Sequence, residues 1–302
     1  MFEETRQAIA DFMGQSRKSQ RQLSKETGLS TSVISQFLNG TYTGDNEEVA
    51  KTIGQYLAVG KERLNSVSDV QFIEKLYNTQ EVLFACNYAH RNNDITLVSG
   101  DAGAGKTTAL KYYAENNTGV IFITANACIT TATAILSLIC RQIGRQVPTR
   151  RAALMNTLVE QLTGTNRLII IDEADHLLLD ALQAVRNLND IAHCGIVLSG
   201  NDKIYRQMLS PRRGYEFEQI RTRIIVRKKV FNEYTIEEMR AMFPSLNQEC
   251  IGYMLKLACA ESLRTARKIY EVAKEVANAK KEALSVKHLR DTQKQLLGEV
   301  MA

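Results

Sequence analysis

The chain has 302 residues, of which 44% are apolar and 24% charged, the composition of an ordinary globular protein with room for two or three domains. No apolar run approaches the length of about 18 residues needed for a membrane span. The N-terminal segment MFEETRQAIA is acidic and amphipathic, which excludes a signal peptide. Six cysteines are scattered without a C-x-x-C pair, which favours free thiols in a reducing cytoplasm over a metal site.

The net charge of +5 is unevenly distributed. Residues 1–63 carry eight basic and eight acidic side chains, residues 203–229 carry nine and two, and residues 264–294 carry nine and four. A further run without acids contains Arg141, Arg145, Arg150 and Arg151. Such clusters favour contact with a phosphate backbone, although a solvated face or contacts between subunits would have the same composition.

Residues 1–57 are predicted to form short helices, with a helix-turn-helix over residues 20–40. Gly28 supplies the turn, Ser30 is an N-cap, and an apolar face follows at Leu29, Val33, Ile34, Phe37 and Leu38. The second helix of such a motif can read DNA, and its predicted outer face is polar but uncharged: Thr31, Ser32, Ser35, Gln36 and Asn39. We therefore expect weak or auxiliary DNA contact, and a helical protein-interaction module is the alternative.

A polar linker is expected over residues 60–68, followed by an amphipathic segment over residues 72–90. Beyond it, apolar β-type runs alternate with helical patterns. Strands are predicted at 95–99, 119–124, 168–171, 195–199 and 224–226, and helices at 106–116, 129–143, 152–162, 175–190 and 202–210. This alternation predicts an α/β fold with a parallel sheet covered on both faces, and ligands bind at the carboxyl ends of such strands.

The first predicted strand leads into a sequence that matches the phosphate-binding P-loop pattern G-x-x-x-x-G-K-[ST], also called Walker A. Its backbone amides would surround the phosphates of ATP, the Lys106 ammonium would neutralise them, and the Thr107 hydroxyl would bind Mg²⁺. The predicted nucleotide-binding residues of this loop are Gly100, Asp101, Ala102, Gly103, Ala104, Gly105, Lys106, Thr107 and Thr108.

A buried-strand pattern ends in two acids 66 residues after Lys106, as in a Walker B segment. We expect Asp172 to hold Mg²⁺ through water and Glu173 to polarise the attacking water. Asn201 follows the next predicted strand, where it can sense the γ-phosphate; a capped strand end is the alternative.

An arginine before the last predicted strand could enter a neighbouring subunit's nucleotide site as an arginine finger, with Arg223 the first choice and Arg221 the second. Residues 232–302 are predicted to be helical. Arg264 begins a long helix there and is a second phosphate-sensing candidate, unless it belongs to the basic face. The tetrapeptide DEAD at residues 172–175 does not indicate an RNA helicase, because the other helicase motifs and a second helicase domain are missing.

The order of these motifs, SGDAGAGKTT, LIIIDEADHL, IVLSGN and LRTARKIYEVA, together with LSTSVISQFLNGTYTGDNE, closely resembles the phage Mu B-type transposition proteins, the AAA+ target-DNA activators. The resemblance covers nearly the whole chain. It implies a helix-turn-helix domain over residues 1–62, an AAA+ P-loop ATPase core over 63–230 and a helical C-terminal lid over 231–302. It places Arg150 and Arg151 in a basic stretch that could face DNA.

The resemblance also implies a function: an ATPase that uses ATP and Mg²⁺, forms helical homo-oligomers on double-stranded DNA with little sequence preference, and delivers that DNA to a DDE-type transposase. Hydrolysis would release the DNA. The expected location is the host-cell cytoplasm, associated with the nucleoid. A helix-turn-helix transcription regulator with an ATPase switch and a helicase-loader-like ATPase remain as alternatives.

Overall fold

The computed structural model describes residues 2–16, 18–65, 72–208 and 214–298. The chain divides into two compact units, Met1–Asp69 and Val70–Ala302, and each has an apolar core of its own. The finer division that we predicted, with borders after residues 62 and 230, stays a prediction.

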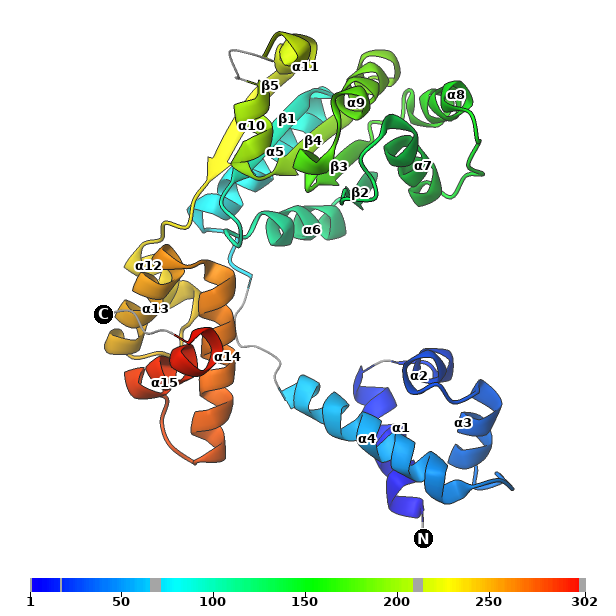
Figure 1. Ribbon diagram of the computed structural model, residues 1–302, viewed down its shortest axis with the longest axis vertical. Coiled ribbons are helices and arrows are strands. Elements are labelled where there is room, and N and C mark those ends of the chain that lie inside the picture. The colour runs from blue at the N-terminus through cyan, green and yellow to red at the C-terminus, as the bar shows by residue number, and fades with distance from the viewer. Residues whose placement is uncertain (1, 17, 66–71, 209–213, 299–302) are drawn as a thin grey trace. The chain divides into compact units, whose positions relative to one another are not determined.

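The first unit packs its helices around one small core. Its helices in the described residues are α1 (Glu3–Ser16), α2 (Gln20–Thr27), α3 (Thr31–Leu38) and α4 (Asn46–Asn65), shown in Figure 1. Ser30 caps α3 by accepting a hydrogen bond from the amide of Val33, and the chain turns between α2 and α3 at Gly28. The core consists of Ile9, Phe12, Leu23, Ile34, Phe37, Val49, Ile53 and Leu57.

The outer face of α3 is polar. Ser35 is partly buried, and the exposed residues there are Thr31, Ser32, Gln36 and Asn39. Contact of this face with DNA stays a prediction.

Helix α4 runs further than the sequence suggested. It continues to Asn65, so residues 60–65, which we expected in a linker, are helical. Lys61, Glu62, Arg63 and Leu64 are strong helix formers and outweigh the weak preference of Gly60. Residues 66–68 of the expected linker lie outside the described residues.

The second unit contains a parallel sheet with the strand order β2-β3-β4-β1-β5. Its strands are β1 (Ile95–Gly100), β2 (Val120–Thr124), β3 (Leu168–Asp172), β4 (Gly195–Gly200) and β5 (Ile224–Val230). This arrangement confirms the predicted parallel sheet. Strands β1, β3 and β4 are buried along their whole length, as expected for strands covered on both faces.

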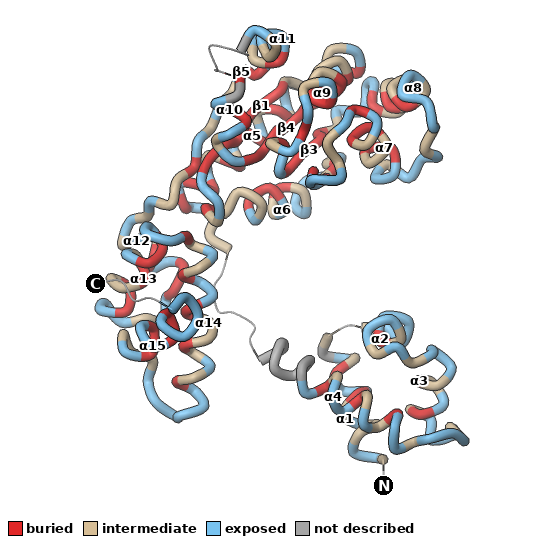
Figure 2. Tube along the Cα trace, in the orientation of Figure 1, coloured by how far each residue is buried: buried red, intermediate tan, exposed pale blue. Residues whose placement is uncertain are grey.

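Successive residues of a strand point to opposite sides of the sheet, so an apolar strand has two faces to bury, and helices cover both. Ile169 and Ile171 pack with residues of α7 (Ala132–Gln142), α8 (Arg151–Leu162) and α9 (Leu179–Ala192). Leu168 and Ile170 pack with residues of α5 (Tyr77–Asn92) and α6 (Lys106–Asn116). Figure 2 shows the buried strands between these helical layers. The remaining elements of this part are α10 (Asp202–Met208), a 3-10 helix at Gly214–Phe217 and α11 (Glu218–Arg221).

The segment after β3 differs from the single helix predicted over residues 175–190. Glu173 has a left-handed backbone (φ 54°, ψ 36°), and a short 3-10 helix, η1 (Ala174–His176), follows it. Extended residues then delay the start of α9 until Leu179. The turn keeps the acids of this segment at the edge of the sheet and does not carry them away along a helix.

The predicted ends of several other strands and helices differ from the observed ends by a few residues. β5 continues to Val230 instead of ending at 226, because its alternation of buried and exposed residues persists through three basic residues. The helix expected from residue 129 begins at Ala132, where Thr131 caps it. The last two residues of the helix expected over 202–210 lie outside the described part of the chain.

The C-terminal part of the second unit is helical, as predicted, and consists of α12 (Ile236–Met242), α13 (Gln248–Ala260), α14 (Leu263–Ala279) and α15 (Val286–Leu297). Pro244 follows the end of α12. The fully buried rings of Phe243 and Tyr270 pack edge to face in a core of their own, with centroids 4.9 Å apart.

No helix among the described residues has the length and apolarity required to cross a membrane. All six cysteines are free thiols, and only Cys128 and Cys259 are exposed. Burial raises the pKa of Cys194 to about 12, which makes this thiol unreactive at neutral pH.

Candidate nucleotide-binding site

The loop after β1 depends on glycine at its first position. Gly100 has φ 143°, and a Cβ built there would lie 1.9 Å from the carbonyl oxygen of Val230 on β5. The amide of Asp101 donates to that same oxygen over 3.1 Å, so the loop is fixed against the neighbouring strand. Only glycine fits this close approach of two backbones. The loop then leads directly into α6, whose N-terminus is a favourable place for phosphate.

Lys106 is folded back onto the loop that precedes it. Its ammonium donates to the carbonyl oxygens of Gly100 and Asp101 over 2.9 and 2.7 Å. Burial lowers the pKa of Lys106, and the nearby carboxylates of Asp172 and Glu173 act in the opposite direction. A desolvated ammonium with only neutral hydrogen-bond partners is well prepared to bind an anion.

Thr107 and Asp172 lie side by side, although Thr107 belongs to the P-loop and Asp172 to the Walker B segment. The Thr107 hydroxyl donates to Asp172 Oδ2 over 2.6 Å, and Ser199 Oγ on β4 donates to Asp172 Oδ1 over 3.0 Å. Asp172 is almost fully buried, and these two hydrogen bonds hold its carboxylate in a fixed orientation. A hydroxyl beside a carboxylate is an oxygen donor set that fits Mg²⁺. These residues would hold the ion if it binds here.

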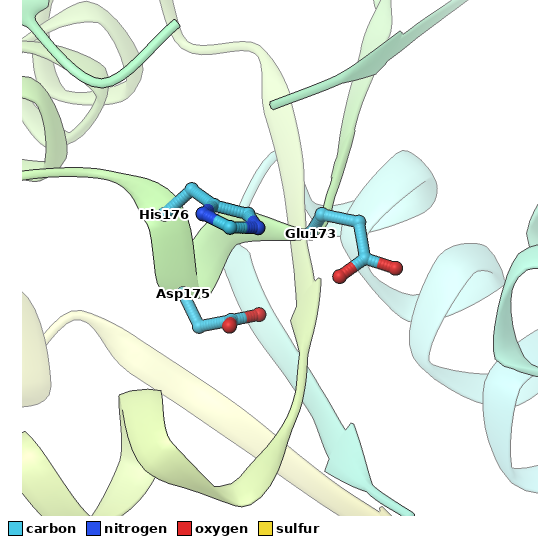
Figure 3. A group of neighbouring side chains, drawn as sticks. All are labelled: Glu173, Asp175 and His176. Carbon is cyan, nitrogen blue, oxygen red and sulfur yellow. The ribbon is translucent and has the colours of Figure 1, made fainter. Parts of the chain in front are cut away.

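Glu173 follows Asp172 with an exposed side chain and a strained backbone. A left-handed conformation in a residue other than glycine is uncommon and often marks a functional site. Figure 3 shows Glu173 beside Asp175 and His176, which project from the short 3-10 helix η1. Ligand atoms of these three residues lie within 4.8 Å of one another.

Asn201 follows β4, which lies between β1 and β3 in the sheet. Its backbone amide donates to Asp175 Oδ1 over 3.1 Å, and its side-chain amide donates to Asp175 Oδ2 over 2.6 Å. The topology thus brings the P-loop, the acids after β3 and Asn201 to the same edge of three adjacent strands.

Several of these groups line a cavity of about 450 Å³, a size typical of small-ligand sites, whereas Gly100, Asp101 and Asp172 are not among its lining residues. The predicted residues among its lining are Ala102, Gly103, Ala104, Gly105, Lys106, Thr107, Thr108, Glu173, Asn201 and Arg264. Its apolar part comes from the segment before α5 and from the C-terminal helices: Phe72, Ile73, Leu76, Tyr234, Met242 and Leu263. The cavity therefore has a phosphate-suited polar end and an apolar end suited to a planar base.

The first turn of α14 contacts the P-loop. A Cβ built at Gly103 would lie 2.7 Å from Cβ of Ser262, the N-cap of α14. Arg264 and Arg267 from this turn line the cavity. Two guanidinium groups can thus approach a bound phosphate from the C-terminal helices, and only Arg264 was predicted from the sequence.

The arginine-finger candidates lie away from this cavity. Arg223 immediately precedes β5, whose first residue pairs with Ile95 at the start of β1. The P-loop follows the other end of β1, so about 20 Å of strand separates it from Arg223. The Arg223 side chain is more than half exposed and forms an ion pair with Asp190 of α9 over 3.2 Å. Arg221 is partly buried, and its carbonyl oxygen accepts a hydrogen bond from Arg227.

The four arginines of the run without acids lie on both sides of the connection between α7 and α8. Arg150 and Arg151 are exposed at the start of α8, and Arg141 and Arg145 are exposed near the end of α7. Arg151 forms a long ion pair of 3.6 Å with Asp180. The other three have no side-chain hydrogen bond or ion pair to the described residues, so their charges are available to a partner.

The basic cluster over residues 203–229 is partly neutralised within the chain. Lys228 forms an ion pair with Glu81 over 2.8 Å, and Lys229 forms one with Asp202 over 2.5 Å. Arg212 and Arg213, from the same cluster, lie outside the described residues. The arginines at the α7–α8 connection are therefore the stronger candidates for contact with phosphate.

Two kinds of site residue were not predicted from the sequence. Ser199 and Asp175 are hydrogen-bonded to the predicted residues, and each lies within three residues of one in the sequence. That proximity was an available signal. The apolar lining by Tyr234 gave no such signal, because this residue is far from the P-loop in sequence and meets it only in the folded chain.

Residues 89–208 match a family model described as an AAA domain. The chain is 32% identical over 214 residues to the ATP-dependent target DNA activator B of Escherichia phage Mu, an alignment that covers 70% of this chain and 67% of that protein. It is 28% identical to the Mu-like prophage FluMu DNA transposition protein B of Haemophilus influenzae, over 68% of this chain and 74% of that protein. Among solved structures it resembles Cdc6p from Pyrobaculum aerophilum, with a TM-score of 0.57 and 18% identity over 78% of this chain and 72% of the other. The core is thus an AAA+ fold.

Proposed function

The chain belongs to the family of ATP-dependent target DNA activators that includes activator B of phage Mu, and from this premise we propose that it is an ATP-switched, sequence-nonspecific DNA-binding ATPase of transposition. The observation that carries the ATPase part is the convergence of Lys106, Thr107, Asp172, Glu173 and Asn201 at one edge of the sheet.

In this proposal the P-loop amides and Lys106 bind the β- and γ-phosphates, and Thr107 and Asp172 hold Mg²⁺, which neutralises phosphate charge when bound. Glu173 accepts a proton from a water molecule as that water attacks the γ-phosphorus, and the bond to the β-phosphate oxygen breaks to give ADP and phosphate. Asn201 and the arginines of α14 contact the γ-phosphate from the other sides. This assignment rests on the exposed position of Glu173 in the cavity wall.

The proposal includes assembly of the protein on itself. Arg223 is too far from its own P-loop to contact the nucleotide there, so a role as arginine finger requires a second copy of the chain. Its ion pair with Asp190 would have to break when the neighbouring phosphate is engaged. Turnover is therefore expected to be slow in isolated subunits.

Mixing two inactive variants tests this arrangement. Lys106→Ala lacks a working nucleotide site and Arg223→Ala lacks the finger, so each alone should hydrolyse ATP at least about 100-fold more slowly than the wild type. A mixture should recover part of the activity, because a Lys106→Ala subunit can offer Arg223 to an intact neighbouring site. Steady-state phosphate release over a range of mixing ratios measures this. Activity of Arg223→Ala alone at the wild-type rate would contradict the assignment.

For the DNA, we propose double-stranded DNA bound through its phosphates by the exposed arginines around the α7–α8 connection, including Arg150 and Arg151. The outer face of α3, with Ser32, Ser35, Gln36 and Asn39, is proposed as an auxiliary contact. We also propose that the protein forms filaments on target DNA and delivers this DNA to a DDE-type transposase in the host-cell cytoplasm, at the nucleoid. There it would stimulate strand transfer and release the DNA after hydrolysis. These steps are drawn from the family relationship.

The test is binding to a random-sequence duplex in ATP, in ADP and without nucleotide, over a series of salt concentrations. Cooperative binding that needs ATP and weakens steeply with salt is expected, since neutralisation of Z phosphates gives a slope of about −0.9Z in log affinity against log salt. Replacing Arg145 and Arg150 with alanine should reduce that slope by about two. Nucleotide-independent binding would count against the proposal. Binding to a single sequence would instead support the alternative of a regulator that reads an operator, against which the uncharged outer face of α3 argues.

A further inference from the structure

We propose that Asp175 is a positioning residue for hydrolysis, which holds the Asn201 side chain in the orientation that contacts the γ-phosphate. This inference rests on the proposed ATPase function and adds a residue to it. Asp175 lies on η1, which follows Glu173 at the end of β3, and Asn201 lies directly after β4.

Both carboxylate oxygens of Asp175 bind the same residue. Oδ1 accepts the backbone amide of Asn201 over 3.1 Å, and Oδ2 accepts its side-chain Nδ2 over 2.6 Å. Asn201 Oδ1 accepts the backbone amide of Lys203 over 2.7 Å. These bonds fix which end of the amide is oxygen and which is nitrogen. The second hydrogen on Nδ2 has no acceptor among the described residues, and Asn201 lines the nucleotide cavity.

The neighbouring Gly200 leaves room for this arrangement. A Cβ built on Gly200 would lie 2.5 Å from Asp175 Oδ1 and 3.1 Å from the Asp175 backbone nitrogen. The backbone of Gly200 is not left-handed, so its lack of a side chain reflects the space that the Asp175 carboxylate occupies. Even alanine at this position would displace the carboxylate.

The hydrogen bonds of Asp175 restrict the orientation of the Asn201 side chain. Asn201 is exposed, and an unheld asparagine side chain on a surface samples several rotamers and both amide orientations. A charge-assisted bond to one Nδ2 hydrogen holds the side chain, and the bond that Asn201 Oδ1 accepts from Lys203 polarises the amide toward donation by the other Nδ2 hydrogen. Because both Asp175 oxygens are engaged with Asn201, we assign this carboxylate to Asn201 and not to a metal ion held with Glu173 and His176.

A double-mutant cycle in the full-length protein tests whether Asp175 acts through Asn201. Asp175→Ala and Asn201→Ala are each expected to lower kcat about tenfold, with less than a twofold change in the Kd of a fluorescent ATP analogue. The double variant should be no slower than Asn201→Ala alone. Gly200→Ala should reproduce the effect of Asp175→Ala, and Asp291→Ala, an exposed carboxylate on α15, is the control that should match the wild type. Multiplied effects in the double variant, or an unchanged kcat in Asp175→Ala, would overturn the inference.

A second readout does not depend on hydrolysis. With selective ¹⁵N-asparagine labelling, the Asn201 side-chain signal, assigned by its loss in Asn201→Ala, should be shifted and exchange slowly with solvent in the wild type. It should move to the position of a free amide in Asp175→Ala. If this signal responds as expected but the wild type shows no ATPase activity, the proposed function fails and the positioning stands. If the wild type is active and the signal does not respond, only the positioning fails.

Discussion

Lys106→Ala is expected to abolish ATP binding and, with it, ATP-dependent DNA binding. The ammonium of Lys106 is the basic group of the loop itself, and it lies within 3 Å of the carbonyls of Gly100 and Asp101. Loss of its charged hydrogen bonds to the phosphates should weaken ATP binding by about 100-fold or more. Titration with a fluorescent ATP analogue and a duplex-binding assay in ATP measure the two effects.

The expected loss should be local. Lys106 is partly buried and neutralises part of the charge of Asp172 and Glu173, so its removal also leaves these acids free to repel an incoming polyphosphate. Thermal unfolding without nucleotide should change little, since the core under the loop is apolar and contains no lysine. Lys111→Ala, an exposed lysine later on α6, is the matched control and should bind ATP normally. Normal DNA binding by Lys106→Ala in ATP would refute the nucleotide switch.

Glu173→Gln is expected to bind ATP but not to hydrolyse it, which leaves the protein on DNA. Glutamine has the same size as glutamate but cannot accept the proton of the attacking water. A general base contributes about 10²- to 10⁴-fold to such reactions, so kcat should fall by at least about 100-fold. The ATP affinity should stay within about threefold of the wild-type value.

The structure favours this separation of binding from turnover. Glu173 is exposed in the cavity wall, and no hydrogen bond to its side chain holds the P-loop or Asp172 in place among the described residues. Glu115→Gln, an exposed acid on α6, serves as the control and should retain activity. Single-turnover phosphate release and the dissociation rate from duplex DNA in ATP are the measurements. Rapid release of DNA by Glu173→Gln in ATP would show that Glu173 does not have this role.

The sequence determined the parts of the site that depend on local chemistry. The spacing of glycines and Lys106 identifies a phosphate loop, because only glycine permits the close backbone approach seen at Gly100. An apolar strand ending in Asp172 and Glu173 identifies the second half of the site. The alternation of strands and helices predicted the parallel sheet, since a strand covered on both faces must be apolar throughout.

Only the tertiary structure decided which distant residues meet. The left-handed turn at Glu173 and the short 3-10 helix after it, where the sequence suggested a long helix from residue 175, keep Asp175 beside Asn201. The strand order places β4 between the two Walker strands and Arg223 at the far end of the sheet. The contact of α14 with the P-loop adds Leu263 and Arg267 to the cavity. Periodicity and propensity act over a few residues, whereas these contacts depend on packing between segments more than 20 residues apart, about which a local pattern carries no information.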